Sequence, residues 1–224
     1  LAQLSETHMV TQQRAAMLDP KAPNPSVEAI LHAIIPFRYV DHTHADAVVT
    51  LTNTPQGEDH IRQVYGDRIL IIPYVMPGFV LAKRIWDLTQ DINWHQYDGM
   101  VLMNHGIFTF ADDARTAYET MVRLVTLAED YLANQEATTV AIATPPPPNL
   151  LQLAQIRKAV SAVRGQPVLA SLDQSPEAVG FSQLPDVGAI ATRGPITPDH
   201  VIRTKPIPVI LGDDPVAAIQ HYAH

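Results

Sequence analysis

The stretch YDGMVLMNHGIFTFA, residues 97–111, contains two apolar runs separated by Asn104, His105 and Gly106. Short apolar runs bounded by turn residues are typical of strands buried inside a sheet. Asparagine and glycine favour the tight turns that join antiparallel neighbours. The stretch therefore predicts a β-hairpin, and a sheet that contains it must include an antiparallel pair.

Helical and strand patterns alternate on the N-terminal side of this hairpin. Such alternation is typical of an α/β domain, in which helices pack on a sheet. Because the hairpin adds an antiparallel pair, the predicted sheet is mixed. The predicted elements are a helix over residues 26–36, a strand over 38–44, helices over 45–53 and 57–66, a strand over 67–75 and a helix over 77–90.

A long helix is predicted on the C-terminal side of the hairpin, over residues 113–135. Asp112 precedes it and can cap its N-terminus, because a short carboxylate side chain accepts hydrogen bonds from the first free N–H groups. The apolar residues recur at helical spacing, which predicts an amphipathic helix. They are Tyr118, Met121, Val122, Val125, Ala128 and Leu132.

Consecutive prolines at residues 145–148 divide the chain. Such a run forbids a helix and favours a stiff, extended spacer. It predicts a domain over residues 1–142, a spacer over 143–149 and a small α/β subdomain over 150–224. Within this subdomain the pattern predicts a helix over 150–164, a strand over 167–172 and a short helix at the C-terminus.

Composition narrows the chemistry. The 224 residues include no cysteine and carry a formal net charge of -8. Disulfides and thiolate metal sites are excluded, so metal ligands have to be His, Asp or Glu. The negative charge argues against sequence-independent binding of nucleic acids, which depends on clustered Lys and Arg. No apolar run approaches the roughly 20 residues that a membrane span needs. We therefore expect no membrane partner and a cytoplasmic location.

His42 and His44 lie one residue apart in the predicted strand over residues 38–44. Because a strand sends alternate side chains to the same face, both imidazoles point the same way and can hold a metal ion. His105, in the hairpin turn, is the best third ligand, and Glu28, in the first turn of the preceding helix, is the natural fourth. This set suits Zn²⁺ in tetrahedral coordination, with Mn²⁺ and Co²⁺ as alternatives.

Each of these residues also has an ordinary structural interpretation. Two histidines one residue apart occur by chance in many strands, and Glu28 can be a helix charge that the dipole favours. From spacing alone, both interpretations stay open. The remaining histidines of the chain's middle and end are interpreted as surface or core residues: His32, His60, His95, His221 and His224.

The segment TRGPITPDHVIRTK, residues 192–205, concentrates basic side chains in an acidic protein. Arg193, His200, Arg203 and Lys205 can supply a phosphate or sugar contact, because their N–H groups donate charged hydrogen bonds to anions. The alternative is a solvated loop beside a strand. Both interpretations stay open.

Four motifs follow one another along the chain: NPSVEAILHA (24–33), VDHTHADAV (40–48), IPYVMPGFVLA (72–82) and MNHGIFTFADDARTAYE (103–119). In this order they resemble the class II aldolase/adducin family. The resemblance covers about residues 17–135 and is closest to the aldolase portion of proteins that join a rhamnulose-1-phosphate aldolase to a short-chain dehydrogenase. The segment over residues 191–206 is also similar to the one that links those two portions.

The resemblance implies a fold, a site and a reaction. The implied fold has three layers, α/β/α, around a mixed and mainly antiparallel sheet. Glu28, His42, His44 and His105 are implied to bind zinc, and Glu28 to act also as a base. The implied reaction cleaves a phosphorylated ketose such as rhamnulose 1-phosphate into dihydroxyacetone phosphate and lactaldehyde. A homo-oligomer, in this family a tetramer, is implied as well.

Other outcomes are compatible with the same resemblance. The fold and metal site also serve sugar-phosphate epimerases and decarboxylases, and the adducin head is an inactive relative that lacks the metal ligands. The proton-donating tyrosine of the simpler aldolases has two candidate counterparts here, Tyr74 and Tyr65. A truncated chain that binds metal without activity is a further alternative.

The sequence departs from the family pattern in two places. The N-terminal Gly-Asn-x-Ser phosphate loop has no match. Since the chain also begins with Leu1 rather than methionine, we expect an upstream segment. No Gly-x-Gly-x-x-Gly is present either, so we expect no nicotinamide cofactor in this chain, and the dehydrogenase portion of the fused relatives is not part of it.

Overall fold

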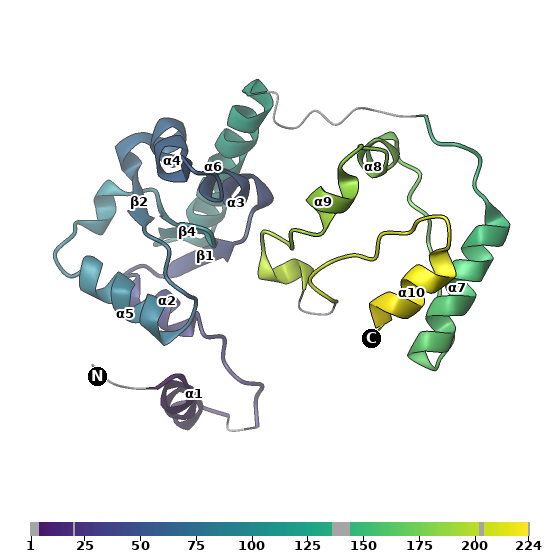
Figure 1. Ribbon diagram of the computed structural model, residues 1–224. Coiled ribbons are helices and arrows are strands. Elements are labelled where there is room, and N and C mark those ends of the chain that lie inside the picture. The colour runs from purple at the N-terminus through teal and green to yellow at the C-terminus, as the bar shows by residue number, and fades with distance from the viewer. Residues whose placement is uncertain (1–4, 20, 136–143, 202–203, 224) are drawn as a thin grey trace. The chain divides into compact units, whose positions relative to one another are not determined.

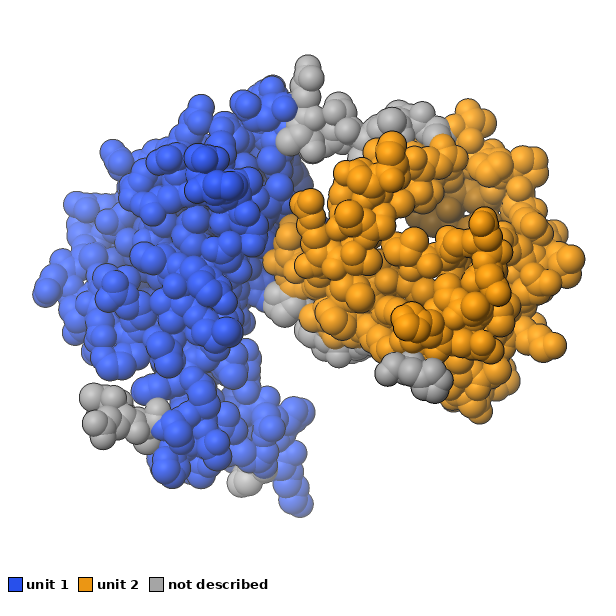
Figure 2. Space-filling model, in the orientation of Figure 1, with its two compact units in different colours: residues 1–135 blue, residues 136–224 orange. Residues whose placement is uncertain are grey.

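The computed structural model describes residues 5–19, 21–135, 144–201 and 204–223 (Figure 1). It divides into two compact units, Leu1–Gln135 (unit 1) and Glu136–His224 (unit 2), which Figure 2 colours separately. The predicted domain boundary after residue 142 and the first spacer residue, Ala143, lie outside the described residues.

Unit 1 is built on one sheet of four strands: β1 (Tyr39–Thr43), β2 (Ile69–Ile72), β3 (Gly99–Leu102) and β4 (Gly106–Ala111). Their order across the sheet is β1-β4-β3-β2. β4 pairs antiparallel with both β1 and β3, whereas β2 pairs parallel with β3. The sheet is therefore mixed and mainly antiparallel, which confirms the prediction, and β3 and β4 form the predicted hairpin.

Helices cover both faces of this sheet (Figure 1). One layer consists of α2 (Ala29–Ile34) and α5 (Phe79–Leu88). The other consists of α3 (Asp46–Thr52), α4 (Gly57–Tyr65) and α6 (Ala114–Asn134). The expected three-layer α/β/α architecture is thereby confirmed. Unit 1 also contains α1 (Glu6–Ala15) and the short 3-10 helices η1 (Gly66–Arg68) and η2 (Trp94–Gln96).

A separate apolar core lies on each face of the sheet. Alternation along β3 sends Met100 and Leu102 into the core with α2 and α5, and Val101 into the core with α3, α4 and α6. Each of these three side chains is at most 1% exposed. Full burial of a side chain of this size stabilises a fold by about 1.5–3 kcal/mol. The hairpin is therefore held between two cores.

The N-terminal cap of α6 is Asp113, not the predicted Asp112. The backbone of Asp113 is extended and its side chain accepts a hydrogen bond from Thr116 N at 2.9 Å. An N-cap side chain reaches the N–H two or three residues onward, so Asp112 lies one residue too early. Although α6 is 21 residues long, neither it nor any other described helix is long and apolar enough to cross a membrane.

Within residues 144–201 and 204–223, unit 2 has helices and no strand. The strand predicted over residues 167–172 is wrong, and the described part of this predicted α/β subdomain is helical. A strand needs a neighbour to bond its N–H and C=O groups, whereas this segment is mostly exposed, with Leu169 fully so. The elements are α7 (Leu150–Arg164), α8 (Pro176–Ser182), α9 (Val187–Ala191), η3 (Pro198–His200) and α10 (Pro215–Ala223).

Candidate metal centre

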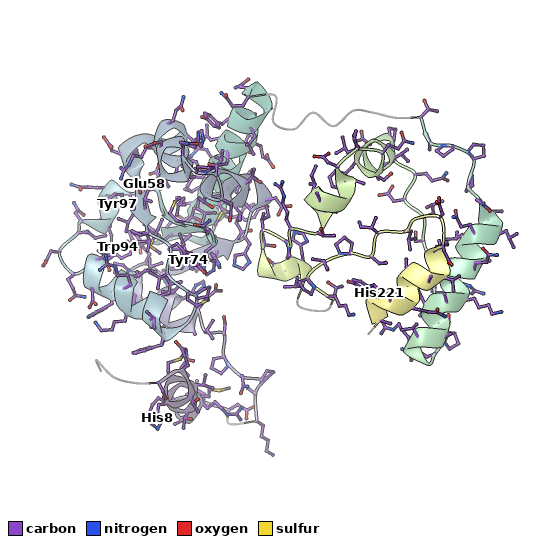
Figure 3. The ribbon with its side chains drawn as sticks, viewed as in Figure 1. His8, Glu58, Tyr74, Trp94, Tyr97 and His221 are labelled. Atoms are coloured by element: carbon purple, nitrogen blue, oxygen red, sulfur yellow. The ribbon has the colours of Figure 1, made fainter. Side chains whose placement is uncertain are left out.

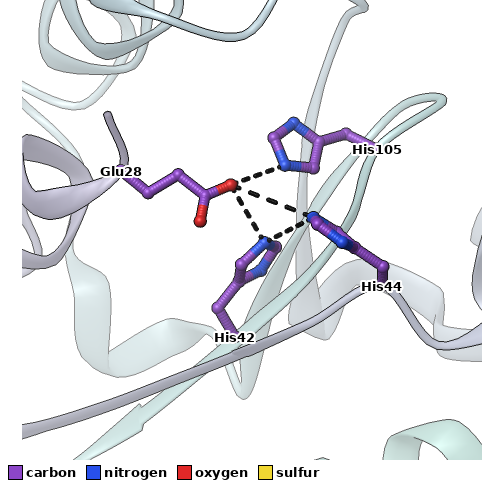
Figure 4. A group of neighbouring side chains, drawn as sticks. All are labelled: Glu28, His42, His44 and His105. Atoms are coloured by element: carbon purple, nitrogen blue, oxygen red, sulfur yellow. Dashed lines mark hydrogen bonds and ion pairs between the residues drawn. The ribbon is translucent and has the colours of Figure 1, made fainter. Parts of the chain in front are cut away.

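Strand β1 carries the two neighbouring histidines to the same side. His42 lies within β1 and His44 follows its last residue. Their ring centroids are 4.8 Å apart and their Nε2 atoms 3.1 Å apart. Figure 4 shows both Nε2 atoms directed toward a common centre. The two-residue period of the strand therefore produces the convergence that the sequence predicts.

His105 reaches the same centre from the turn between β3 and β4. Its backbone N donates to Leu102 O at 3.1 Å, which closes the turn. The ring is buried, with centroids 5.3 Å from that of His42 and 5.0 Å from that of His44. The hairpin of β3 and β4 therefore also carries the third imidazole.

Glu28 completes the group from the N-terminus of α2 (Figure 4). Its backbone N donates to Ser26 Oγ at 3.1 Å, which fixes the entry into the helix. Its Oε1 lies 2.9 Å from His105 Nε2, 3.3 Å from His42 Nε2 and 3.9 Å from His44 Nε2. The hydrogen bond from His105, followed by that from His42, lowers the pKa of the Glu28 carboxyl far below its usual range, although partial burial opposes this. The side chain is therefore a carboxylate at neutral pH.

The four side chains fit a divalent cation. One ligand atom from each lies within 4.8 Å of the others. Zn–N and Zn–O bonds of about 2.0–2.1 Å in a tetrahedron place ligand atoms roughly 3.3 Å apart. The contacts of 2.9–3.9 Å described above bracket that separation. Three imidazoles and one carboxylate are also the nitrogen and oxygen donors that zinc accepts.

A hydrogen bond on the side of the ring that faces away from the centre orients His42. Its Nδ1 lies 3.0 Å from Ile107 O, a carbonyl that can only accept, so Nδ1 carries the proton. In the neutral ring Nε2 then has no proton, so it can present its lone pair to a metal ion in place of its contact with Glu28, as a metal ligand must. The ring also stacks on Phe108, with centroids 4.0 Å apart. His105 differs, because its Nδ1 is buried and has no hydrogen-bond partner among the described residues.

Gly106 leaves room for this packing. A β-carbon at this position would lie 2.5 Å from Thr43 O, 3.0 Å from His42 Cε1 and 3.1 Å from His44 Cδ2. These distances are shorter than ordinary van der Waals contacts. Glycine therefore allows the hairpin turn to approach the strand that carries both histidines.

The two candidate tyrosines lie in different surroundings. Tyr74, labelled in Figure 3, follows β2 and is 53% exposed, and its hydroxyl group donates to Met76 Sδ at 3.9 Å. Tyr65 is buried in the core with α6, and its hydroxyl group donates to Leu124 O at 2.9 Å. Burial raises the pKa of Tyr65. Tyr65 therefore serves packing, and neither tyrosine belongs to the four-residue group.

Arg193, His200 and Lys205, which were predicted to bind a phosphate or sugar, lie in unit 2. The fourth predicted residue, Arg203, is outside the described residues. Arg193 and His200 are exposed. His200 and Lys205 line the same hollow of about 430 Å³. The Lys205 ammonium donates to Tyr222 O and lies 4.3 Å from the centre of the Tyr222 ring, so it already has partners within the unit.

Sequence reasoning missed one contact beside the centre. Asn104 Nδ2 donates to Asn53 Oδ1 at 2.9 Å, across 51 positions of the chain. Asn104 was evident as a turn residue, but no spacing or motif points to Asn53. In the structure Asn104 also stands out by its backbone, whose φ is +59°.

Two family models match this chain. The first, the Class II Aldolase and Adducin N-terminal domain, matches residues 1–132. The second, Aldolase class II, second domain, matches residues 149–224. The first match lies in unit 1 and the second in unit 2.

One named relative and one solved structure are similar to this chain. The uncharacterized oxidoreductase YuxG of Bacillus subtilis (strain 168) is 28% identical over 222 residues, which are 95% of this chain and 32% of that protein. This chain therefore spans about a third of that relative's length. A solved structure, the N-terminal class II aldolase domain of a conserved protein from Thermoplasma acidophilum, is 36% identical with a TM-score of 0.52. That match covers 58% of this chain and 59% of the solved one.

Proposed function

We propose, because this chain belongs to the class II aldolase and adducin family, that it is a zinc-dependent aldolase. The proposed reaction cleaves a carbon–carbon bond of a phosphorylated ketose such as rhamnulose 1-phosphate. The products are dihydroxyacetone phosphate and lactaldehyde. Mn²⁺ or Co²⁺ can take the place of Zn²⁺, since the same nitrogen and oxygen donors bind them.

One observation carries this proposal: Glu28, His42, His44 and His105 converge so that one ligand atom of each lies within 4.8 Å of the others. A divalent cation held by these residues supplies Lewis acidity, which stabilises negative charge on substrate oxygens. Such stabilisation replaces the Schiff-base lysine that metal-free aldol cleavage needs. The adducin head resembles these enzymes but lacks the ligands, so the intact group favours an enzyme over a scaffold.

Glu28 is proposed as the base. Cleavage removes a proton from the hydroxyl group that becomes the aldehyde and adds one at the carbon left by the broken bond. Glu28 is the carboxylate of the group, so once it leaves the metal it can accept the proton at that carbon during bond formation and return it during cleavage. Tyr74 is proposed as the partner that takes the hydroxyl proton in cleavage and returns it to the aldehyde oxygen in bond formation, because its side chain is exposed and lacks the backbone contact that holds Tyr65.

The basic residues of unit 2 are proposed to bind the substrate's phosphate. Arg193 and His200 are exposed and carry N–H donors suited to a phosphate. The contacts of Lys205 with Tyr222 make it the weaker candidate. If this proposal holds, Arg193→Ala raises KM for a phosphorylated ketose and leaves kcat nearly unchanged, because phosphate contacts far from the reacting bond act equally in the ground and transition states.

The relative from Bacillus subtilis supports the proposal that this aldolase portion is joined to a dehydrogenase portion in a longer protein. It is named an oxidoreductase, and this chain matches 32% of it. This agrees with an aldolase portion joined to a dehydrogenase portion in such proteins.

We also propose that the chain forms a homo-oligomer, which is a tetramer in the aldolases of this family. A measurement of the molar mass in solution tests this proposal.

The deciding experiment measures release of dihydroxyacetone phosphate from rhamnulose 1-phosphate by the Zn²⁺-loaded chain. We expect release, and its loss in Glu28→Gln and His105→Ala. His95→Ala is the matched control, because His95 is an exposed histidine of unit 1 outside the group. An epimer or carbon dioxide as the product would replace cleavage by epimerisation or decarboxylation. Turnover that persists in His105→Ala would contradict the assignment of the site.

A further inference from the structure

We propose that Asn104, together with Asn53, is a positioning residue that fixes His105 in the metal centre; this inference rests on the metal-binding role proposed above. Asn104 immediately precedes His105 and has a φ of +59°. No other non-glycine residue in the described part of the chain has a positive φ. Side chains with a β-carbon disfavour this left-handed region, and asparagine tolerates it best.

The turn requires this conformation. The hydrogen bond from His105 N to Leu102 O defines a four-residue turn with Met103 and Asn104 at its centre. Met103 does not have a positive φ, so only the third residue of the turn does. Type II turns have this pattern, and glycine or asparagine occupies their third position. The backbone of Asn104 therefore sets the direction in which the next residue, His105, leaves the turn.

The side chain of Asn104 ties the turn to α3. Its Nδ2 donates to Asn53 Oδ1 at 2.9 Å, and Asn53 Nδ2 donates to Val49 O at 2.8 Å. Asn53 caps the C-terminus of α3, whose residues Val48 and Leu51 are at most 2% exposed. Because these side chains anchor α3 in the core, Asn53 is a fixed point for the turn.

The hydrogen bond between Asn104 and Asn53 connects the two segments that carry the histidines of the metal centre. α3 begins at Asp46, two residues after His44, so the same short segment carries two of the histidines and the anchor for the third. The Asn104–Asn53 bond therefore joins the strand side of the centre to the hairpin side. Neither asparagine is part of the ligand group.

His105 depends on such support more than His42 does. The His42 ring is held by Ile107 O, whereas His105 Nδ1 has no hydrogen-bond partner among the described residues. The ring of His105 therefore takes its position from its backbone, from packing and from the 2.9 Å contact of its Nε2 with Glu28. Metal centres need their ligands placed within about 0.5 Å, and loss of a supporting contact typically costs about 10- to 100-fold in metal affinity.

Three variants separate the two contributions of Asn104. Asn104→Gly keeps the backbone conformation and removes the side-chain bond, and Asn53→Ala removes the same bond from the other side. Asn104→Ala removes the bond and also strains the turn. The test measures Zn²⁺ affinity by competition with a chromophoric chelator, and the visible absorption of Co²⁺, which reports the coordination geometry.

We expect Asn104→Gly and Asn53→Ala each to weaken Zn²⁺ binding about tenfold. The double variant Asn104→Gly/Asn53→Ala should bind Zn²⁺ no more weakly than either single variant, because each single change already removes the same hydrogen bond. Asn104→Ala should lie nearer 100-fold and alter the Co²⁺ spectrum. Asn93→Ala is the matched control, because Asn93 Oδ1 accepts from His95 N in a turn outside the centre; it should bind like the wild type.

Wild-type affinity and an unchanged Co²⁺ spectrum in Asn104→Ala and Asn53→Ala would overturn the inference alone. A wild-type chain that takes up no metal would instead overturn the proposed function, and this inference with it. If Asn104→Ala does not fold, the comparison of Asn104→Gly with Asn53→Ala carries the test, since neither strains the backbone.

Discussion

Gly106 is the residue at which the metal centre leaves least room. The neighbours that its missing β-carbon would meet are the backbone of Thr43 and the rings of His42 and His44. None of them can yield cheaply, because the backbone belongs to a paired strand and the rings face the other ligands. This one position therefore links backbone packing to metal binding.

Gly106→Ala should lower both stability and metal affinity. Overpacking of this kind costs about 1–3 kcal/mol of unfolding free energy, which urea denaturation measures. Zn²⁺ binding should weaken in the same variant, because both rings must shift. Gly188→Ala is the control, since a β-carbon at Gly188 meets nothing within 4 Å. Equal stability and equal Zn²⁺ affinity in the two variants would show that Gly106 is not required.

At the residue scale, local patterns predicted the members of the centre but not their support. The two-residue period of a strand is enough to align His42 with His44, and turn composition places His105 at an open position. Asn53 lies 51 positions from Asn104, and its contact arises only when α3 and the hairpin pack together. No pattern within a short window contains that information.

At the scale of elements, the hairpin was predictable because its signals agree. Both strands are buried throughout, Asn104 lies in the turn between them and Gly106 directly follows that turn. The segment over residues 167–172 shows the opposite case. Its composition favours a strand, but no strand of the described chain pairs with it, and Leu169 is exposed. A strand forms where a neighbour satisfies its backbone groups, which local sequence does not report.

The start of α6 provides a prediction at the same scale. Asp113→Ala should destabilise unit 1, because it removes the bond to Thr116 N that caps the helix. Thermal unfolding followed by circular dichroism measures the loss. Asp112→Ala, one position earlier, should change stability little. The reverse order of the two effects would restore Asp112 as the cap.

At the scale of the whole molecule, Asp98 joins elements that the sequence separates widely. It precedes β3 and accepts hydrogen bonds from Arg68, before β2, and from Arg123, in α6. The hydrogen bond from the Arg68 guanidinium is the main reason that the pKa of Asp98 lies below its ordinary value of 3.8. The second bond, from Arg123, acts in the same direction and outweighs, together with the first, the opposing effect of burial.

Because the pKa of Asp98 is lowered in the folded state, its contribution to the free energy of unfolding depends on pH. A carboxyl group whose pKa is lower in the folded state adds stability above its ordinary pKa and loses it as pH falls through the folded value. Asp98→Asn should therefore be less stable than the wild type at pH 7, and the difference should close in acid below pH 3.8. Both arginines are more than half exposed, so added salt should also shrink it. A difference in unfolding free energy that is constant from pH 7 to pH 2 would contradict this role.

The proposed metal centre joins the two layers of unit 1, because Glu28 comes from the layer of α2 and His44 leads into α3. A ligand bound only by the folded protein stabilises it, by about 2.7 kcal/mol at 100 times the dissociation constant. Whether these four residues hold a metal ion is tested directly by the zinc content of the protein. Elemental analysis after incubation with Zn²⁺ and removal of excess should find one equivalent per wild-type chain and per His95→Ala chain, and none per His42→Ala or His105→Ala chain. A wild-type chain without stoichiometric metal, or a His42→Ala chain that keeps a full equivalent, would contradict the account.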